Sequence, residues 1–514
     1  MSAGPFTRQF NPLLIGSQNS SGNAGQAIYE PLMMDDLAKQ VNRPWLVTSF
    51  AWSDGGHTLT LKIRQGVKWS DGKPMTAEDV AYTFDLIRQN KGLNTGGLPL
   101  AGASAPSPDT AAIRFTEPAY QIMWWRTTPV PKHLWSGVSD PVKYANPNPV
   151  GTGPYAFKSF TPQAITLQKN PYYWQPGMPS LKTVQYISFD SNTSMIAALQ
   201  SAEVDWISPS TTDVKAVTRG QTSKIGYWVT KSSNAMIFLL PNGAMYPTNQ
   251  APVRKAISQA LDRKEINSVA LGGQNEVAES PTGLDLGSRG DTIAPQYRSL
   301  RYGAADPAAA RQALTAAGYT QGKDGIFVTP QGKRLSLTLS LPTTSPYGDW
   351  VRVSRVLTTQ LRKAGIALST TTESQVAWRN DTELGRFQLT MRSTGGTLST
   401  YDLFDRVFAQ PISPVGTKTQ RNYERYTSAE AGALLNTYAN ASLGSSAEQK
   451  ALAGLETIQV NEVPVIPLFF TAGVGMWRTD RFTGWPSQND PYAVSVANSP
   501  NVELVLMRLR AKGH

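Results

Sequence analysis

Apolar and polar residues alternate at period two in short segments spread along the chain. Residues 58–64 follow this pattern, and so do residues 183–189 and 335–341. Successive side chains of an extended strand point to opposite faces, so the alternation predicts strands with one face buried in a core. A further strand is predicted at residues 366–372.

Apolar residues at helical spacing predict the helices. Val80, Phe84 and Ile87 lie on one helical face, and Thr76 followed by Asp79 gives a capping pattern that satisfies backbone donors at a helix start. Helices are predicted from residue 76 onwards and at 192–199, 252–260, 307–318 and 350–364. Helices and strands alternate along the chain, which predicts an α/β fold.

Length and composition limit the classes of protein. The chain has 514 residues, more than one hydrophobic core usually sustains, so two or three domains are expected. Apolar residues make up 40% and charged residues 17% of the sequence, which excludes a disordered or fibrous chain. The sequence has 13 Trp, 3 His and no Cys, a composition that disfavours redox or metal chemistry and favours ligand binding on flat apolar surfaces. We expect no cofactor.

The basic net charge does not by itself identify a partner. It is +11, and a basic surface could bind nucleic acid or anionic lipid. Lys and Arg are dispersed, however, and the sequence has no nucleic-acid-binding motif, so we expect no nucleic-acid partner. No apolar run reaches the roughly 18 residues of a membrane span, and the first residues lack a secretory signal. The chain is expected to be a mature exported domain without its signal peptide.

Motifs of common enzymes are absent from the sequence. It has no Gly-x-Ser-x-Gly elbow, no His-Glu-x-x-His pair and no phosphate-binding loop. A glycoside hydrolase would need two carboxylates beside its aromatic residues, and no such pair stands out, since Glu78 and Asp79 are explained by helix capping. We therefore expect a binding protein without catalytic residues, and a glycoside-active enzyme is the less favoured alternative.

Several longer motifs follow one another over most of the chain. They are residues 29–32, 52, 61–80, 129–133, 150–155, 170–174 and 253–262. In this order they resemble the signature of the extracytoplasmic solute-binding protein family 5, the peptide, nickel and oligosaccharide receptors of ABC importers. Agreement over several long motifs is more specific than one short pattern. The resemblance implies a monomer in the periplasm, or lipid-anchored on the outer face of the cell membrane, that delivers its ligand to permease subunits.

The resemblance also implies the fold. It is a two-lobed arrangement like the type II periplasmic binding proteins, with an extra domain as in their cluster C and a hinge between the lobes. The expected division is lobe I from residues 1–35, 165–260 and 478–514, the extra domain from 36–164, and lobe II from 261–477. A ligand that touches both lobes makes its full set of contacts only in the closed form, so binding favours closure.

The ligand class is inferred from how the chain departs from the family. Peptide receptors of the family usually carry an Asp that pairs with the amino terminus of the peptide, and residues 391–402 lack that motif, although Asp402 could replace it. A buried ammonium without a carboxylate is unfavourable. Residues 414–426 and 482–493 are similar to the cellobiose-type branch. The resemblance therefore implies a β-linked gluco- or xylo-oligosaccharide, with an oligopeptide or dipeptide as the alternative.

The candidate ligand-binding residues are polar or aromatic side chains, with glycines that let the backbone approach a ligand. They are Ser17, Gln18, Asn19, Trp378, Arg392, Thr394, Gly395, Gly396, Tyr401, Asp402 and Trp477. Trp378 is expected to form an aromatic wall, because a pyranose ring presents an apolar face to Trp and hydroxyls to polar side chains. The alternative for each residue is an ordinary role in a loop, a core or a lobe interface.

The other tryptophans and the histidines are interpreted differently. Trp52, Trp69 and Trp174 belong to family-wide motifs and are expected to be structural, whereas Trp124 and Trp125 are weaker candidates for the cleft. Trp485 stands beside Trp477 as a further candidate. Nickel is disfavoured and no metal site is expected, because the chain has only three imidazoles, at His57, His133 and His514.

Overall fold

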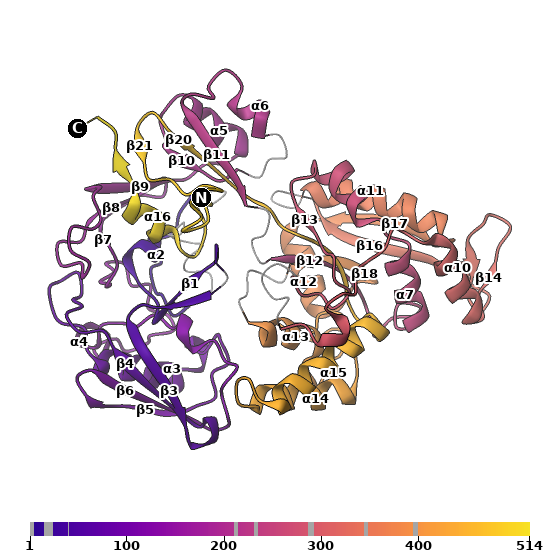
Figure 1. Cartoon of the computed structure of the whole chain (residues 1–514), viewed down its shortest axis with the longest axis horizontal. Helices are drawn as coiled ribbons and strands as arrows, with labels where there is room; N and C mark the ends of the chain where they lie inside the picture. Colours follow the sequence, from indigo (N-terminus) through magenta and orange to yellow (C-terminus); the bar gives the residue numbers. More distant parts are fainter. Residues whose placement is uncertain are drawn as a thin grey trace. The chain divides into compact units, whose positions relative to one another are not determined.

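The computed structural model in Figure 1 describes residues 5–14, 24–39, 41–209, 214–230, 235–285, 292–343, 348–393 and 399–513. The chain forms two compact units, residues 1–230 with 473–514 and residues 231–472. The first unit is therefore built from two separate stretches of sequence. Within the described parts of the chain, every helix is too short or too polar to span a membrane.

An antiparallel four-stranded sheet forms one part of the first unit. Its strands, in spatial order, are β3 (Val47–Ser53), β4 (Thr58–Ile63), β6 (Thr110–Phe115) and β5 (Leu100–Ser107). Helix α3 (Ala77–Gln89) packs on β5 and β6 and buries Val80, Phe84 and Ile87. The strand predicted at residues 58–64 and the helix predicted after Thr76 are both confirmed.

The start of α3 has the predicted capping box. The Thr76 hydroxyl accepts a hydrogen bond from the Glu78 amide at 3.3 Å, and the Asp79 carboxylate accepts one from the Thr76 amide at 2.9 Å. We expect Thr76→Ala to lower the free energy of unfolding by about 1 kcal/mol, because one helix-start donor loses its partner. Urea unfolding followed by circular dichroism measures this loss. Thr76→Ser, which keeps the hydroxyl, is the control, and an equal loss in both variants would contradict the capping role.

Two three-stranded antiparallel sheets also belong to the first unit. They are β7 (Tyr155–Phe160), β8 (Ala164–Lys169) and β9 (Thr183–Ile187), and then β10 (Trp206–Ile207), β20 (Gly473–Arg478) and β11 (Ile225–Thr230). Strand β20 follows the second unit in sequence and pairs with β11 along its whole length. This pairing joins the returning chain to the first unit.

Short elements connect these sheets. They are α2 (Ala24–Ile28), β1 (Met33–Asp36), β2 (Val41–Pro44), η3 (Trp124–Arg126), α4 (Lys132–Trp135), α5 (Asn192–Gln200), α6 (Val214–Thr218), β21 (Phe482–Thr483), α16 (Val502–Arg508) and β22 (Arg510–Ala511). Helix α5 is the one predicted at residues 192–199. One hydrophobic core runs from Phe6 to Leu509 and includes α16 and the four-stranded sheet.

A six-stranded mixed sheet forms the centre of the second unit. Its order is β13 (Glu276–Val277), β19 (Ile466–Phe470), β12 (Met236–Pro241), β18 (Leu389–Ser393), β16 (Ser336–Pro342) and β17 (Ala367–Glu373). Strand β16 runs parallel to β17 and β18, whereas the other pairs are antiparallel. Strands β16 and β17 confirm the strands predicted at 335–341 and 366–372.

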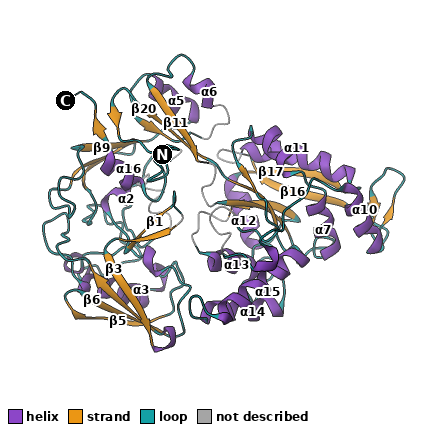
Figure 2. Ribbon diagram, in the orientation of Figure 1, coloured by secondary structure: helices purple, strands orange, loops and turns teal. Residues whose placement is uncertain are grey.

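Helices cover both faces of this sheet (Figure 2). They are α7 (Ala251–Gln259), α8 (Arg263–Glu265), α10 (Pro307–Ala316), α11 (Gly348–Lys363), α12 (Gln375–Leu384), α13 (Thr400–Phe408), α14 (Ala429–Asn440) and α15 (Ser446–Glu462). Successive residues of β12 enter opposite cores: Ile237 and Leu239 join the core with α11, and Phe238 joins the core with α14 and α15. The short hairpin β14 (Thr320–Gln321) and β15 (Phe327–Val328) follows α10. Helices α7, α10 and α11 confirm the predicted ones.

The sequence predicted three parts, two lobes and an extra domain, whereas the contacts divide the chain into two compact units. The contacts place residues 235–260 in the second unit, where β12 is an interior strand, whereas the sequence-based division put residues up to 260 in lobe I. The segment 236–241 is buried on both faces, so its pattern does not indicate which sheet it joins. A separate domain at residues 36–164 stays a prediction.

Buried carboxyl groups lie in both units. Burial raises the pKa of Glu30 and of Glu456 to about 7 and that of Glu424 to about 8, from an ordinary value of 4.5. A group whose pKa is raised in the folded state stabilises the fold fully below its unfolded pKa and loses that contribution as pH rises through the folded pKa.

We therefore expect the free energy of unfolding to fall as pH rises from about 5 to about 8, by about 1.4 kcal/mol per pH unit for each such group. Urea midpoints measured across this range test the expectation. Glu424→Gln, which cannot ionise, should flatten the pH dependence. A midpoint that rises with pH would contradict it.

Candidate functional site

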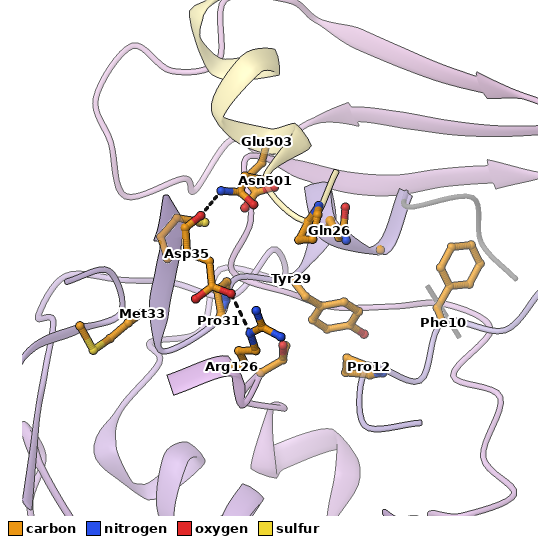
Figure 3. Close-up of a pocket in the computed structure, with 14 residues that line it drawn as sticks. Phe10, Pro12, Gln26, Tyr29, Pro31, Met33, Asp35, Arg126, Asn501 and Glu503 are labelled. Atoms are coloured by element: carbon orange, nitrogen blue, oxygen red, sulfur yellow. Dashed lines mark hydrogen bonds and ion pairs between the residues drawn. The ribbon is translucent and has the colours of Figure 1, made fainter. Parts of the chain in front are cut away.

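A cavity of about 190 Å³ lies inside the first unit (Figure 3). Its walls come from α2, the turn into β1, η3 and the residues before and within α16. The lining residues are Phe10, Pro12, Gly25, Gln26, Tyr29, Pro31, Met33, Met34, Asp35, Arg126, Thr128, Pro500, Asn501 and Glu503. Tyr29 and Pro31 belong to the motif at residues 29–32, so a family-like segment contributes directly to this wall.

An ion pair forms the polar wall of the cavity. Arg126 Nε donates to Asp35 Oδ2 at 2.7 Å, and Trp125 Nε1 donates to Asp35 Oδ1 at 2.9 Å. The Asn501 side-chain amide also donates to the Asp35 carbonyl oxygen. The Asp35 side chain is 9% exposed but that of Arg126 is 34% exposed, so the cation is the accessible member of the pair. Figure 3 shows the Arg126 and Asp35 side chains pointing toward each other on this wall.

Two buried oxygen atoms on the same wall lack hydrogen bonds. Among the described residues, Asn501 Oδ1 and Glu503 Oε2 have no partner, although both side chains are almost fully buried. Burial, with a smaller effect of the nearby Glu30, raises the pKa of Glu503 well above its ordinary value. Unsatisfied buried polar groups are unfavourable. Both residues line the cavity, but these two oxygen atoms themselves are almost inaccessible to solvent.

Glu30 holds the motif at residues 29–32 in place behind the cavity. Its carboxylate accepts hydrogen bonds from Trp45 Nε1 at 2.7 Å, from the Tyr173 hydroxyl at 2.9 Å and from Trp174 Nε1 at 3.2 Å. The donors come from two segments of the first unit, around Trp45 and at residues 173–174. Trp174 therefore has the structural role expected of it, and Glu30 positions Tyr29 and Pro31 at the cavity wall.

A second cluster of predicted residues lies in the other unit. Arg392, on β18, stacks on the Tyr423 ring at 4.2 Å and donates from Nη2 to the Tyr423 hydroxyl at 3.0 Å. Its guanidinium carbon also lies 5.4 Å from the Trp378 ring centre. The structure thus brings Arg392 and Trp378 together, as part of one cation and aromatic cluster.

Trp378 itself is a core residue in this structure. It is 3% exposed, its Nε1 donates to Thr390 Oγ1 at 2.9 Å, and its ring packs edge-on against Trp350 at 5.9 Å. A ligand wall needs an open ring face, which such burial does not leave. The ligand role of Trp378 stays a prediction, but its contacts are those of packing.

Tyr401 and Asp402 lie in the first turn of α13, which Ser399 caps by accepting a hydrogen bond from the Asp402 amide at 3.1 Å. Asp402 is buried and receives a hydrogen bond from Arg406 Nε at 2.9 Å, so it already has a cationic partner. Tyr401 packs edge-on against Tyr438. Their binding roles stay predictions.

The remaining predicted residues do not join this cluster. Trp477 belongs to β20 of the first unit, where it is buried and stacked on Trp485 at 5.5 Å. Six others lie outside the described residues: Ser17, Gln18, Asn19, Thr394, Gly395 and Gly396. Among the described residues, no group of three or more His, Asp and Glu is arranged to hold a metal ion.

Sequence reasoning missed the polar wall of the cavity. Asp35 and Arg126 are 91 positions apart, and Asn501 is a further 375 positions along the chain, so no local spacing relates them. The one available signal was Trp125, a weaker candidate for the cleft, which bonds to Asp35. Buried partners that are distant in sequence become visible only in three dimensions.

Comparison with known proteins gives the family. The sequence profile of the bacterial extracellular solute-binding proteins, family 5 Middle, matches residues 42–411. The oligopeptide-binding protein AppA of Bacillus subtilis is 27% identical over 445 residues, which cover 82% of this chain and 78% of AppA. This chain is therefore similar to AppA over most of both sequences.

Solved structures show the same fold. A mannohexaose-bound periplasmic oligopeptide-binding protein of an ABC transporter from Thermotoga maritima is 24% identical, with a TM-score of 0.80 over 100% of this chain and 97% of its own. The structure of AppA from Bacillus subtilis with a nonapeptide is 22% identical, with a TM-score of 0.72 over 100% and 98% of the two chains. The two-lobed α/β fold class expected from sequence is confirmed.

Proposed function

Because this chain belongs to family 5 of the bacterial extracellular solute-binding proteins, and is thus the extracytoplasmic substrate-binding component of an ABC importer, we propose that it captures an oligopeptide. It is a binding protein rather than an enzyme, and its membrane partner is the permease of the importer. The ligand class and the residues that hold it are the proposal.

The main support for this proposal is the polar wall of the cavity, formed by Arg126 and Asp35. A peptide brings amide donors and acceptors, an ammonium and a carboxylate, whereas a neutral sugar brings hydroxyls alone. The partly exposed Arg126 guanidinium suits a carboxylate or a peptide carbonyl. The relative AppA is named for oligopeptide binding, which supports the same class.

This proposal reverses the preference for an oligosaccharide that the sequence suggested. That preference rested on the absence of an ammonium-pairing acid motif in residues 391–402, and on the similarity of residues 414–426 and 482–493 to the cellobiose-type branch. A peptide also brings a carboxylate, which the Arg126 guanidinium at the cavity of the first unit can receive without an acid in residues 391–402. The missing motif therefore does not exclude a peptide.

An oligosaccharide is the second candidate, because the similar Thermotoga maritima protein was solved with mannohexaose although its name describes an oligopeptide-binding protein. A thermal-shift screen of di- to nonapeptides against gluco-, xylo- and manno-oligosaccharides separates the two. We expect peptides to raise the melting temperature in a concentration-dependent way, since a ligand that binds only the folded state stabilises it. Stabilisation by sugars alone would reject the peptide proposal.

A further inference from the structure

A second cavity, of about 360 Å³, lies elsewhere in the first unit and has a different character. Its walls come from β9, β10, the segment around β21 and α16 with the residue after it. The lining residues are Phe6, residues 181–187, Phe189, residues 203–206, Phe482, Trp485, Ala497, Val502, Leu506 and Leu509. It shares no lining residue with the cavity at Asp35 and Arg126.

Aromatic rings form one wall of this second cavity. Trp206 and Trp485 meet edge to face at 5.6 Å, and Phe482 meets Trp485 in the same way at 6.5 Å. Trp477 stacks on Trp485 at 5.5 Å with an interplanar angle of 19°. These contacts hold the aromatic wall in one geometry before any ligand arrives.

The polar atoms of these rings are already used. Trp206 Nε1 donates to the Ser495 carbonyl at 2.7 Å, and Trp485 Nε1 donates to the Arg478 carbonyl at 3.2 Å. The two indoles therefore offer carbon surface and no free donor. Val502, Leu506 and Leu509 recur at helical spacing and add an aliphatic wall, while Asn501 and Glu503 of the same segment line the first cavity.

The charged groups at this cavity balance one another. Glu203 and Asp205 are the lining acids and Lys182 is the lining base. Arg481 is the second base, because its Nη1 lies 2.7 Å from Asp205 Oδ1. Two acids and two bases leave no net charge, so the cavity selects neither a cation nor an anion.

We propose that this second cavity is a binding site for a single small, flat, uncharged ring compound, separate from the site of the imported solute. Its volume and predominantly apolar, aromatic lining are those of small-molecule sites. Edge and face contacts with aromatic rings favour an aromatic ligand over an aliphatic chain. The inference does not depend on the class of the transported ligand.

The test titrates the full chain with 1-naphthylamine, an uncharged flat probe whose fluorescence changes in apolar sites. We expect saturable binding of one probe per chain. Val204→Trp and Val184→Trp each place a large ring in the cavity and should weaken binding at least tenfold. Val376→Trp, at a side chain that is 81% exposed in the other unit, is the matched control and should bind as the unmodified chain does.

The two filling variants lie in different segments, Val184 in β9 and Val204 before β10, so the test still gives a result if one variant fails to fold, as judged by circular dichroism. Binding that does not saturate, or that is equal in the filled and unfilled proteins, would overturn the proposal. 1-Naphthylmethylammonium and 1-naphthoate are the charged probes and should bind at least tenfold more weakly. Tighter binding of either one would overturn the assignment to an uncharged ligand.

Discussion

Trp378→Ala is expected to lower the free energy of unfolding of the second unit by about 3 to 5 kcal/mol, the usual loss for a buried Trp. The side chain is 3% exposed, and its removal would leave a cavity beside Trp350 and a Thr390 hydroxyl without the indole donor. Hydrogen exchange of the α12 and β18 amides measures the effect locally, since the two units need not unfold together.

Val376→Ala is the control for Trp378→Ala. It lies on the same helix but is 81% exposed, so we expect a change within about 0.5 kcal/mol. The alternative role of Trp378 as a ligand wall makes a different prediction. A small loss of stability combined with a tenfold loss of ligand affinity would show that the ring faces the ligand.

Arg126→Gln is expected to weaken oligopeptide binding about ten- to a hundredfold, equivalent to about 1.4 to 2.7 kcal/mol. The variant removes the accessible cation of the cavity and leaves the largely buried Asp35 carboxylate without its charged partner. Isothermal titration calorimetry with a peptide found by the thermal-shift screen measures the affinity.

Arg88→Gln is the matched control for Arg126→Gln, because Arg88 pairs with Asp85 on the surface of α3 and does not line the cavity. Surface ion pairs contribute little, so affinity and stability should both stay close to those of the unmodified chain. Equal affinity in the Arg126→Gln variant would remove this cavity from the ligand site.

Local patterns predicted much of the secondary structure. The alternation at residues 58–64 and the Thr76 cap correspond to β4 and α3, and the predicted helix at 350–364 is α11. These features depend on residues close in sequence, so short windows contain the needed information. The local patterns also predicted the α/β class, and the family resemblance then supplied the two-lobed arrangement.

Long-range relations were not available from one sequence. Strand β12 is buried on both faces and gives no periodicity, so its position inside the sheet of the second unit was not predicted. Abundant tryptophan suggested ligand platforms, yet Trp378 and Trp477 are buried. Trp485, a further candidate from sequence, lines a cavity of the first unit. Large aromatic side chains occur in hydrophobic cores as well as in ligand sites. The exposure of the ring, which the sequence does not give, distinguishes a core residue from a ligand platform.

The central claim is that an oligopeptide is the imported solute and that Arg126 contacts it. Calorimetric titration of the unmodified and Arg126→Gln proteins, each with a nonapeptide and with a manno-oligosaccharide, tests both parts together. The account predicts saturable peptide binding that weakens at least tenfold in the variant, with no measurable sugar binding. Saturable sugar binding without peptide binding would contradict it.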